Sequence, residues 1–475
     1  MKQPTVFLSR IASALFFIMT VMLIISAPAC SGGAASGVRT DDTTSHSLPD
    51  TLRVGTLYSP MSYFIYRGEP MGYDYSLIND FATAKGLVLD LQVATSLNSL
   101  VRMLDSGEVD ILAYEIPVTA EYKEHIIPCG PETFTSQVLV QPKQPKGGYP
   151  RITNVTELIG RDVYVEKDSK YQHRLENINE NLGGGINIHP IDRDTLITED
   201  LIEMVSQDEI PLTIVDSDIA RINKTYYPNL DISLEVSFPQ KASWGVASGN
   251  AWLADSINAW FAMDEPRKEN AVLLKRYFEL SKGLPPSIMT LDLSKGHVSP
   301  FDAYFRKYAS EADIDWRLLA SQGFVESRFN PSAVSWAGAR GVMQIMPGTG
   351  RQFGASPAQL ADTETSIRLA TKIYNLLDKS LSSDVPDPVE RRKFIMAAYN
   401  GGIAHVRDAI ALAKKYGLNP QVWDGNVEKA LLMKSKPEYF NDPVCRYGYF
   451  RGTETTRYVK DVISLYDRVR KRIKA

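Results

Sequence analysis

The strongest constraint on the fold is an alternation of strand-like and helix-like segments that begins at Leu52. Short runs rich in β-branched residues are typical of buried strands, whereas apolar residues every three or four positions are typical of helices. The strand-like runs are LRVGTLY, VLDLQVA and VDILAYEI, and the helix-like segments between them are YDYSLINDFATAKG and SLNSLVRMLDSG. This alternation predicts a mostly parallel α/β sheet.

A second set of such segments runs from Arg151 to about Asn229 and contains TELIGRDVYVEKDSK, GINIHPI and TEDLIEMVSQDEIPLTIVDSD. After it, the strand-like LEVSFPQKASWGVASGN and one long amphipathic helix, expected from Ala251 to Leu280, return to the first set. We therefore expect α/β structure over residues 51–282, with the second set at about 145–229.

Proline, glycine and serine cluster in residues 281–300, SKGLPPSIMTLDLSKGHVSP. Such a shift in composition marks a domain boundary, and we place a linker at residues 283–297. Beyond it, apolar residues recur at spacings of three and four without strand-like alternation. Residues 298–475 are therefore predicted to be mainly α-helical, and a chain of 475 residues has room for two or three domains.

The first thirty residues have the layout of an export signal. Lys2 and Arg10 precede an uncharged apolar run from Ile11 to Ala29, and APAC then ends at Cys30. The arrangement resembles the lipobox of bacterial lipoproteins, whose cysteine carries the lipids that anchor the protein. The alternative is an uncleaved membrane anchor, for which the run is just long enough. Both interpretations predict a membrane-tethered protein outside the cytoplasm.

We expect a signal peptide at residues 1–29 and a lipidated, flexible tether at residues 30–50, because the sequence after Cys30 is small and polar. No acidic run follows Cys30, which disfavours export to the cell surface in species that use such a signal, so we expect an outer-membrane lipoprotein that faces the periplasm.

Composition argues against several classes of partner. The net charge of -4 disfavours nucleic acid, and six scattered histidines offer no zinc spacing, so neither a metal nor another cofactor is expected. Cys129 and Cys445 lie far apart in the sequence, and we predict two separate buried thiols rather than a disulfide.

The α/β region resembles the bacterial extracellular solute-binding proteins of family 3, which have the type 2 periplasmic binding protein fold. The resemblance rests on LRVGT, GEPMGYDYSLINDFATAKGL, LDSGEVDILAYEIPVTAEYKEHI and TIVDSDIA, spread over residues 51–282. It implies two α/β lobes, the second at about 145–229, that close on a ligand between them.

One departure from this family concerns ligand binding. Where the family usually has T-P-E-R, with an arginine that binds the ligand's α-carboxylate, this chain has Thr119, Ala120, Glu121 and Tyr122. A tyrosine donates one neutral hydrogen bond and cannot replace the arginine fork.

The resemblance places Asp216 at the amino-group site and Asp74 in the first-lobe loop, which leaves room for a cationic or peptidic ligand. The alternative is a cleft that binds nothing and serves as a scaffold.

In the helical region, one carboxylate lies on an apolar stripe. A helix from Trp316 to Ser327 would place Trp316, Leu319 and Gly323 on one face, with Glu326 on the same stripe. A carboxyl group withdrawn from water has a raised pKa and can act as a proton donor. The alternative is a structural glutamate paired with an arginine such as Arg328 or Arg340.

Three motifs of this region resemble the goose-lysozyme-like SLT domain of lytic transglycosylases: ESRFNPSAVSWAGARGVMQIMP at 326–347, AAYNGG at 397–402 and ETTRYV at 454–459. Together with the preceding solute-binding module, they are similar to the membrane-bound lytic murein transglycosylase F family. The resemblance implies that Glu326 is the catalytic acid and base, and that peptidoglycan glycan strands are the substrate.

The resemblance also implies roles for seven further residues in binding the glycan or bordering Glu326: Ser335, Met343, Gln344, Tyr399, Asn400, Glu454 and Tyr458. For Met343, Tyr399 and Tyr458 the alternative is core packing. Gly338 and Gly341 are expected in a tight turn that lets the backbone approach the glycan.

Ordinary glycosidases need two carboxylates. The sequence around Glu326 supplies no second one at a suitable spacing, because Asp313 and Asp315 are better explained as helix caps. The family's chemistry uses one glutamate and closes a 1,6-anhydro ring between the atoms of the muramoyl residue itself. We therefore expect a lytic transglycosylase whose N-terminal module senses a muropeptide or stem peptide. The alternatives are a hydrolytic muramidase and a non-catalytic peptidoglycan-binding scaffold.

Overall fold

The computed structural model describes residues 48–474 except 119, 146–149, 192–197, 281–290, 292 and 294–295. The predicted signal peptide, Cys30, most of the tether and most of the linker lie outside the described residues. Within them, none of the helices combines the length and the apolar character that crossing a bilayer requires.

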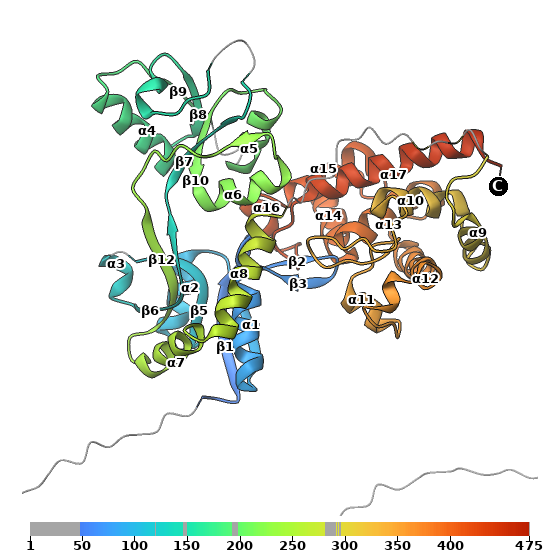
Figure 1. The fold of residues 1–475 in the computed structure, drawn as a ribbon, viewed down its shortest axis with the longest axis horizontal. Coiled ribbons are helices and arrows are strands. Elements are labelled where there is room, and N and C mark those ends of the chain that lie inside the picture. The colour runs from blue at the N-terminus through green and yellow to red at the C-terminus, as the bar shows by residue number, and fades with distance from the viewer. Residues whose placement is uncertain are drawn as a thin grey trace, which may run out of the picture. The chain divides into compact units, whose positions relative to one another are not determined.

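The first lobe is built on a five-stranded sheet of order β4-β1-β5-β12-β6 (Figure 1). Its strands are β1 (Thr51–Leu57), β4 (Val88–Ala94), β5 (Ile111–Pro117), β6 (Ile126–Thr135) and β12 (Gln240–Ala247). β1 pairs in parallel with β4 and β5, as predicted, whereas β12 pairs antiparallel with β5 and β6. β12, the strand that returns from the second lobe, therefore lies between β5 and β6 and completes the first sheet.

Helices cover both faces of this sheet. Apolar side chains of α1 (Tyr73–Lys85), α7 (Ala251–Phe261) and α8 (Asp264–Phe278) pack in one core, and those of α2 (Leu97–Asp105) pack in the other. A short α3 (Ala120–Lys123) precedes β6. The strands are thus buried on both sides, which explains their continuous apolar character.

The second lobe contains a sheet of order β11-β7-β10-β8-β9. Its elements are β7 (Gln137–Pro142), η1 (Val155–Leu158), β8 (Asp162–Glu166), α4 (Lys170–Asn181), β9 (Asn187–Ile191), α5 (Thr198–Ser206), β10 (Thr213–Asp216), α6 (Ser217–Tyr226) and β11 (Leu230–Asp231). The sheet begins before the expected boundary near residue 145, because β7 pairs antiparallel with β10. The α/β class and the two-lobed arrangement are as predicted.

The single helix expected from Ala251 to Leu280 is two helices, α7 and α8, with a break at Ala262 and Met263. Pro266 explains the break. In one continuous helix its ring would clash with the carbonyl of Ala262, whereas in the first turn of α8 its missing N–H costs nothing.

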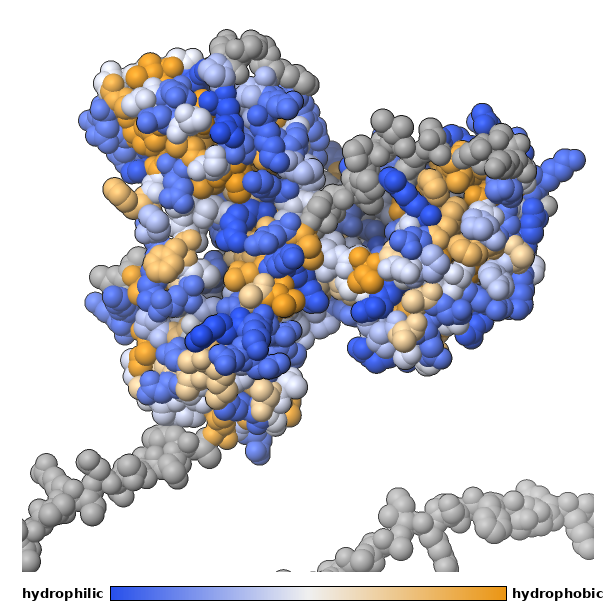
Figure 2. All heavy atoms as spheres, in the orientation of Figure 1, coloured by the Kyte–Doolittle hydropathy of each residue, from blue (hydrophilic) through white to orange (hydrophobic). Residues whose placement is uncertain are grey.

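The C-terminal region is helical, as predicted. Its elements are α9 (Asp302–Ser310), α10 (Trp316–Ser327), α11 (Pro347–Gln352), η2 (Gln359–Ala361), α12 (Thr363–Leu381), α13 (Pro388–Gly401), α14 (Ile403–Lys415), η3 (Trp423–Val427), α15 (Glu428–Met433), α16 (Pro437–Phe440) and α17 (Gly452–Arg472). They enclose one core to which α10, α12, α13 and α17 contribute. In Figure 2, hydrophilic side chains cover most of the visible surface, with hydrophobic ones in patches between them.

A hairpin of β2 (Phe64–Tyr66) and β3 (Glu69–Met71) extends from the first lobe to the helical domain (Figure 1). Its two-residue turn, Arg67 and Gly68, has positive φ at both positions (50° and 80°). This combination is typical of the tight turns whose twist matches that of paired strands. The hairpin therefore presents the Arg67 side chain at its tip.

Candidate active site and interlobe cavity

Glu326 lies in the last turn of α10, whose bounds are those predicted from the sequence. Asp315 caps this helix by accepting a hydrogen bond from the amide of Arg317, and Trp316, Leu319 and Gly323 are buried along the expected stripe. The side chain of Glu326 is only 3% exposed. The apolar stripe therefore places a carboxyl group inside the domain.

α17 supplies a hydroxyl group to this carboxyl group. The Tyr458 hydroxyl donates a hydrogen bond of 2.7 Å to Oε1 of Glu326. Glu454, one turn earlier on α17, accepts a hydrogen bond of 3.2 Å from the hydroxyl of Tyr66 on the hairpin. The expected i and i+4 pair therefore faces the site, but only Tyr458 contacts Glu326 directly.

Arg67 provides the positive charge beside Glu326. Its Nη2 lies 3.3 Å from Oε2 of Glu326, and its Nη1 donates a hydrogen bond of 2.8 Å to the carbonyl of Gln344. The partner considered from the sequence was Arg328 or Arg340, whereas Arg67 lies 259 residues before Glu326. The dipeptide Arg67-Gly68 could have indicated a hairpin turn, but nothing local could have shown where that turn docks.

Burial raises the pKa of Glu326 above its ordinary value, although the charge of Arg67 and the hydrogen bonds from Tyr458 and Arg67 act in the opposite direction. A carboxyl group in such a site retains its proton to higher pH than an exposed glutamate. This is the property that a general acid needs at neutral pH.

A second carboxyl group belongs to the same site. Burial raises the pKa of Glu454, Arg67 lowers it, and the charge of Glu326 raises it. The sequence around Glu326 contains no acidic companion, but the fold brings Glu454 within electrostatic reach of it.

Two of the predicted glycan-binding residues hold the loop after α10 in place. The Gln344 side chain is buried, with a φ of 47°, and its amide donates to the carbonyls of Ala333 (3.1 Å) and Gly341 (2.9 Å). Ser335 accepts a hydrogen bond of 3.0 Å from the amide of Ala339. Gly341, with a φ of 79°, packs against the carbonyl of Leu360, so its missing Cβ serves packing inside the domain.

Three other predicted residues, Met343, Tyr399 and Asn400, are buried inside the helical domain. Met343 is fully buried in the core, as in the core-packing alternative, and its carbonyl accepts a hydrogen bond of 2.8 Å from the Tyr399 hydroxyl. Tyr399 therefore does not hydrogen-bond Glu326. The Asn400 side chain, also buried, accepts a hydrogen bond of 2.7 Å from Thr455 at the start of α17.

The hairpin contacts the catalytic region along its length. The rings of Tyr66 and Trp336 lie 5.3 Å apart, and Glu69 accepts a hydrogen bond of 3.3 Å from the amide of Thr349. Gly402, the last residue of the AAYNGG motif, has a φ of 98°, and a Cβ there would lie 3.1 Å from the amide nitrogen of Gly68. The hairpin tip therefore fits against a surface that glycine keeps open.

A buried charged group supports the base of the hairpin. His405 Nε2 lies 2.9 Å from the carbonyl of Ile65, and its Nδ1 lies 2.9 Å from Nζ of the fully buried Lys434. Lys434 also pairs with Asp408 at 2.5 Å. Burial and the charge of Lys434 hold the pKa of His405 well below its usual range, so the neutral ring donates from Nε2.

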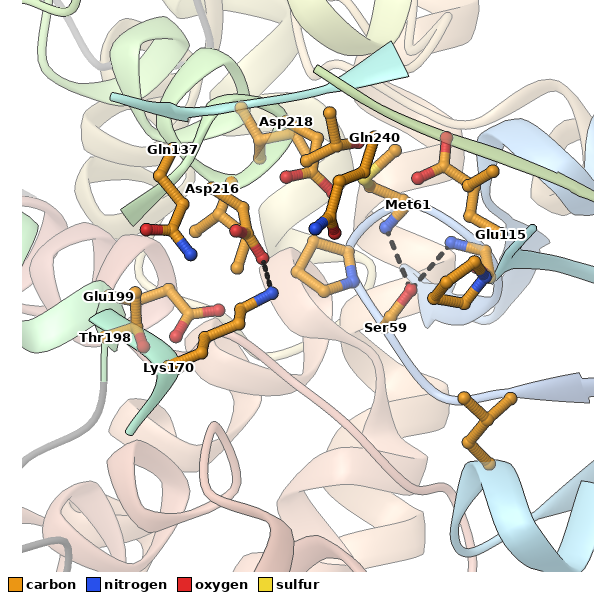
Figure 3. A pocket seen from close by; sticks show the side chains of 18 of the residues that line it. Ser59, Met61, Glu115, Gln137, Lys170, Thr198, Glu199, Asp216, Asp218 and Gln240 are labelled. Carbon is orange, nitrogen blue, oxygen red and sulfur yellow. Dashed lines mark hydrogen bonds and ion pairs between the residues drawn. The ribbon is translucent and has the colours of Figure 1, made fainter. Parts of the chain in front are cut away.

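A cavity of about 1110 Å³ separates the two lobes (Figure 3). Asp216, predicted to bind a ligand, lines it, but this carboxylate is already paired with Lys170 at 2.5 Å and accepts a hydrogen bond from Tyr171. Part of the wall comes from the catalytic domain, including Phe440 and Tyr449.

Asp74 and Tyr122, also predicted for this cleft, are not among the described residues that line the cavity. Asp74 is completely buried in the first lobe, where it accepts hydrogen bonds from Ser62 (2.7 Å) and Trp244 (2.8 Å). Tyr122 packs against the core that contains α2, and Thr119 lies outside the described residues. The resemblance had placed Asp74 in the first-lobe loop, whereas the structure places it in the first turn of α1.

Arg451 connects the catalytic domain to the second lobe. Its guanidinium group donates to the Asn223 side chain (2.7 Å) and to the Tyr227 hydroxyl (3.0 Å), at the end of α6. It also lies over the ring of Tyr226 at 4.1 Å. The catalytic domain thus contacts the first lobe through the hairpin and the second lobe through Arg451.

Family models match both regions. Residues 52–280 match the bacterial extracellular solute-binding proteins of family 3, and residues 303–421 match the transglycosylase SLT domain. Both resemblances found in the sequence are thereby confirmed. Solved structures similar to this chain include a P235GK mutant of the arginine-binding protein ArgBP from T. maritima. That likeness covers 48% of this chain and 95% of the other, at 20% identity and a TM-score of 0.36.

Curated relatives span both regions. The protein named membrane-bound lytic murein transglycosylase F from Desulfosudis oleivorans is 31% identical over 413 residues, which cover 86% of this chain and 87% of that protein. The protein of the same name from Shewanella halifaxensis is 31% identical over 425 residues, which cover 88% and 86%. Because the likeness extends over nearly the whole of each relative, the chain belongs to the membrane-bound lytic murein transglycosylase F family, whose members are peptidoglycan lytic transglycosylases.

Proposed function

We propose that this lytic transglycosylase cleaves the β-1,4 bond between N-acetylmuramic acid and N-acetylglucosamine and leaves 1,6-anhydromuramoyl ends, with Glu326 as its single acid and base. The observation that carries the proposal is the buried Glu326 carboxyl group, held by the Tyr458 hydroxyl. Its raised pKa suits a group that must begin the reaction protonated.

The reaction needs no water. Glu326 gives its proton to the glycosidic oxygen as the bond from that oxygen to C1 of the muramoyl residue breaks. The resulting carboxylate then takes the proton of the C6 hydroxyl group, and O6 forms a bond to C1. The protons balance, because Glu326 loses one proton to the glycosidic oxygen and regains one from the C6 hydroxyl group.

Product analysis of wild type and Glu326→Gln tests this chemistry. We expect the variant to lose at least about 10²-fold in cleavage rate, because general acid–base catalysis contributes that much or more. Glu311→Gln, an exposed glutamate of the same domain, is the matched control and should cleave normally. Wild-type products should be one water lighter than hydrolysed ones.

The same experiment separates the alternatives. Hydrolysed ends would identify a muramidase, for which Glu454 is the second carboxyl group in the site. Binding of glycan without cleavage by the wild type would identify a scaffold. Full activity of Glu326→Gln would remove the catalytic assignment.

We further propose that a muropeptide or stem peptide binds between the lobes and changes access to Glu326. Support comes from the contacts of the catalytic domain with both lobes, because a lobe closure must alter the Arg67 contacts, the Arg451 contacts or both. Stem peptides titrated into a glycan-cleavage assay should change the rate. The proposal fails if neither the rate nor the melting temperature changes.

The proposed anchor is a lipid on Cys30, with the enzyme in the cell envelope on the periplasmic face of the outer membrane. Labelling of cells with a fatty acid should mark the wild-type protein and not Cys30→Ser. Equal labelling of both would exclude this cysteine as the lipid site.

A further inference from the structure

Two carboxyl groups face the interlobe cavity without a cation of their own. Glu115 lies on β5 of the first lobe, and Asp218 lies in the first turn of α6 of the second lobe. Figure 3 shows both side chains bordering the cavity, with Gln240 nearby. Within the described part of the chain, neither carboxylate has a basic group within 4.0 Å. Neither was singled out from the sequence.

Buried acceptor atoms in this cavity lack donors. Oδ1 of Asp218 and Oε1 of Gln137 are withdrawn from solvent, and no described residue donates a hydrogen bond to either atom. A buried acceptor without a donor is unfavourable, and such atoms are rare in folded proteins. Both residues line the cavity, so a turn of either side chain would bring its unpaired oxygen to a ligand placed there.

The carboxylate expected to bind an amino group is not available in this state. Lys170 of α4 already neutralises Asp216 at 2.5 Å. Asp218, two residues later, points to the same cavity and lacks such a partner. The carboxylate that is free to bind an amine is therefore Asp218 in the first turn of α6, and not Asp216 at the end of β10.

The electrostatics of the pair favour a positive guest. Burial and the charge of Asp216 raise the pKa of Asp218 to about 6, while burial, Asp74 and Asp218 raise the pKa of Glu115. Arg221 and Lys170 lower these values only by action at a distance. A cation between the two carboxylates would favour the charged form of both.

We infer that the cavity binds a primary ammonium group of its ligand between Glu115 and Asp218, and so selects short peptides that carry a free side-chain amine. The inference deepens the proposed ligand-sensing role and rests on it. An ammonium group brings three donors to a site with two carboxyl groups and, among the described residues, no cation within 4.0 Å of either. The cavity volume lies just above the range of about 300–1,000 Å³ that is typical of small-molecule sites, which suits a peptide better than one amino acid.

The location of the two acids gives this binding a mechanical consequence. Closure of the lobes brings the two carboxyl groups together, their charged forms repel each other, and an ammonium group between them removes that repulsion. Asp218 begins α6, and the same helix carries Asn223, which Arg451 of the catalytic domain contacts. Helix α6 therefore links the proposed amine-binding residue at its start to the contact with the catalytic domain near its end.

The experiment uses the full chain and a lysine-containing tripeptide, with the Nε-acetylated tripeptide as the uncharged probe. Calorimetry should show that acetylation weakens binding to wild type at least tenfold. Asp218→Asn should weaken binding of the free amine by a similar factor and make acetylation almost neutral, because both changes remove the same interaction. Glu115→Gln tests the first-lobe partner, and Glu180→Gln, an exposed glutamate of α4, is the control.

Equal affinity of wild type for the two tripeptides, or no binding of either, would overturn the inference. So would calcium chloride competing fully with the amine at low concentration, because a metal would then be the natural guest. Circular dichroism of each variant checks folding, and Glu115→Gln serves if Asp218→Asn does not fold. Glycan cleavage is measured in parallel: cleavage that persists without amine binding removes only this inference, whereas loss of anhydro products removes the proposed reaction.

Discussion

The proton on Glu326 depends on a competition between burial and two neighbouring donors. Burial favours the neutral acid, whereas Arg67 and the Tyr458 hydroxyl favour the carboxylate. The donors are also what fix the orientation of the carboxyl group, because each binds a different oxygen. Positioning and proton retention therefore make opposite demands on the same side chains.

Tyr458→Phe separates these two demands. Removing the hydroxyl group takes away a hydrogen bond that stabilises the charged form, so the pKa of Glu326 should rise further. A catalytic acid is lost as pH rises through its pKa, so the alkaline limb of the pH–rate profile should move to higher pH. The maximal rate should fall about tenfold, because one hydrogen bond that positions the acid is lost.

Tyr416→Phe, on the surface at the end of α14, is a control that should leave the profile unchanged. A shift of the alkaline limb to lower pH in Tyr458→Phe would contradict the assignment of Tyr458 as a donor to the carboxylate.

At the scale of single residues, the sequence predicted the position of Glu326 and not its surroundings. Helical periodicity is local, so it was enough to place Glu326 on the buried stripe of α10. Arg67 belongs to another domain, and the lengths of the connections between them carry no information on which side chains meet. Likewise, motif resemblance named Gln344 and Met343, but their hydrogen bonds and burial depend on the loop geometry.

Among the elements, the β2–β3 hairpin has the greatest effect on the active site. Its turn holds Arg67 in the left-handed region, which costs a non-glycine residue about 1 kcal/mol. The hairpin places a cation against Glu326 and an aromatic ring against Glu454, and the side chain of Glu326 is only 3% exposed. In the proposed mechanism, a glycan strand reaches Glu326 only after the tip of the hairpin moves away.

Arg67→Ala should raise the basal rate of glycan cleavage by the full chain about tenfold, because it removes the ion pair that retains the tip. The rate is measured with purified peptidoglycan in the absence of added peptide. Arg102→Ala, an exposed arginine on α2 of the same lobe, is the control and should have the wild-type rate. A basal rate below wild type in Arg67→Ala would show that the arginine assists catalysis instead.

The bounds of some helices and strands differed from those expected. The differences occur where strand pairing or a proline determines the boundary. The bounds of α10 followed from its apolar stripe and its Asp315 cap. The second lobe began earlier than expected because the place of β7 depends on its pairing with β10, which no local pattern encodes. The break between α7 and α8 could have been predicted, since Pro266 is visible in the sequence.

For the whole molecule, the important feature is that one catalytic domain contacts two lobes. Arg451 contacts α6 in the second lobe, and the hairpin extends from the first. A single contact would respond only to the movement of its own lobe, because one lobe can move without the other. In the proposed regulation, the two contacts together make the catalytic domain sensitive to the distance between the lobes.

Arg451→Met should reduce the coupling free energy between peptide binding and glycan cleavage by about 0.5–2 kcal/mol, while peptide affinity stays nearly constant. The measurement is the cleavage rate with and without saturating stem peptide. Arg457→Met, whose side chain is 48% exposed on α17, is the control. An unchanged peptide response in Arg451→Met would show that the signal does not pass through α6.

One detail of the docked hairpin bears on how easily it is released. Nε of Arg67 is buried, and no described residue accepts a hydrogen bond from it. Leaving such a donor unsatisfied costs about 1–3 kcal/mol, which water restores once the arginine leaves. The docked position of the hairpin tip is therefore only slightly more stable than the released position. A small ligand that binds one lobe arrangement more tightly by only a few kcal/mol would then be enough to release the tip. An arginine with all its hydrogen bonds satisfied would hold the tip too firmly for such a ligand.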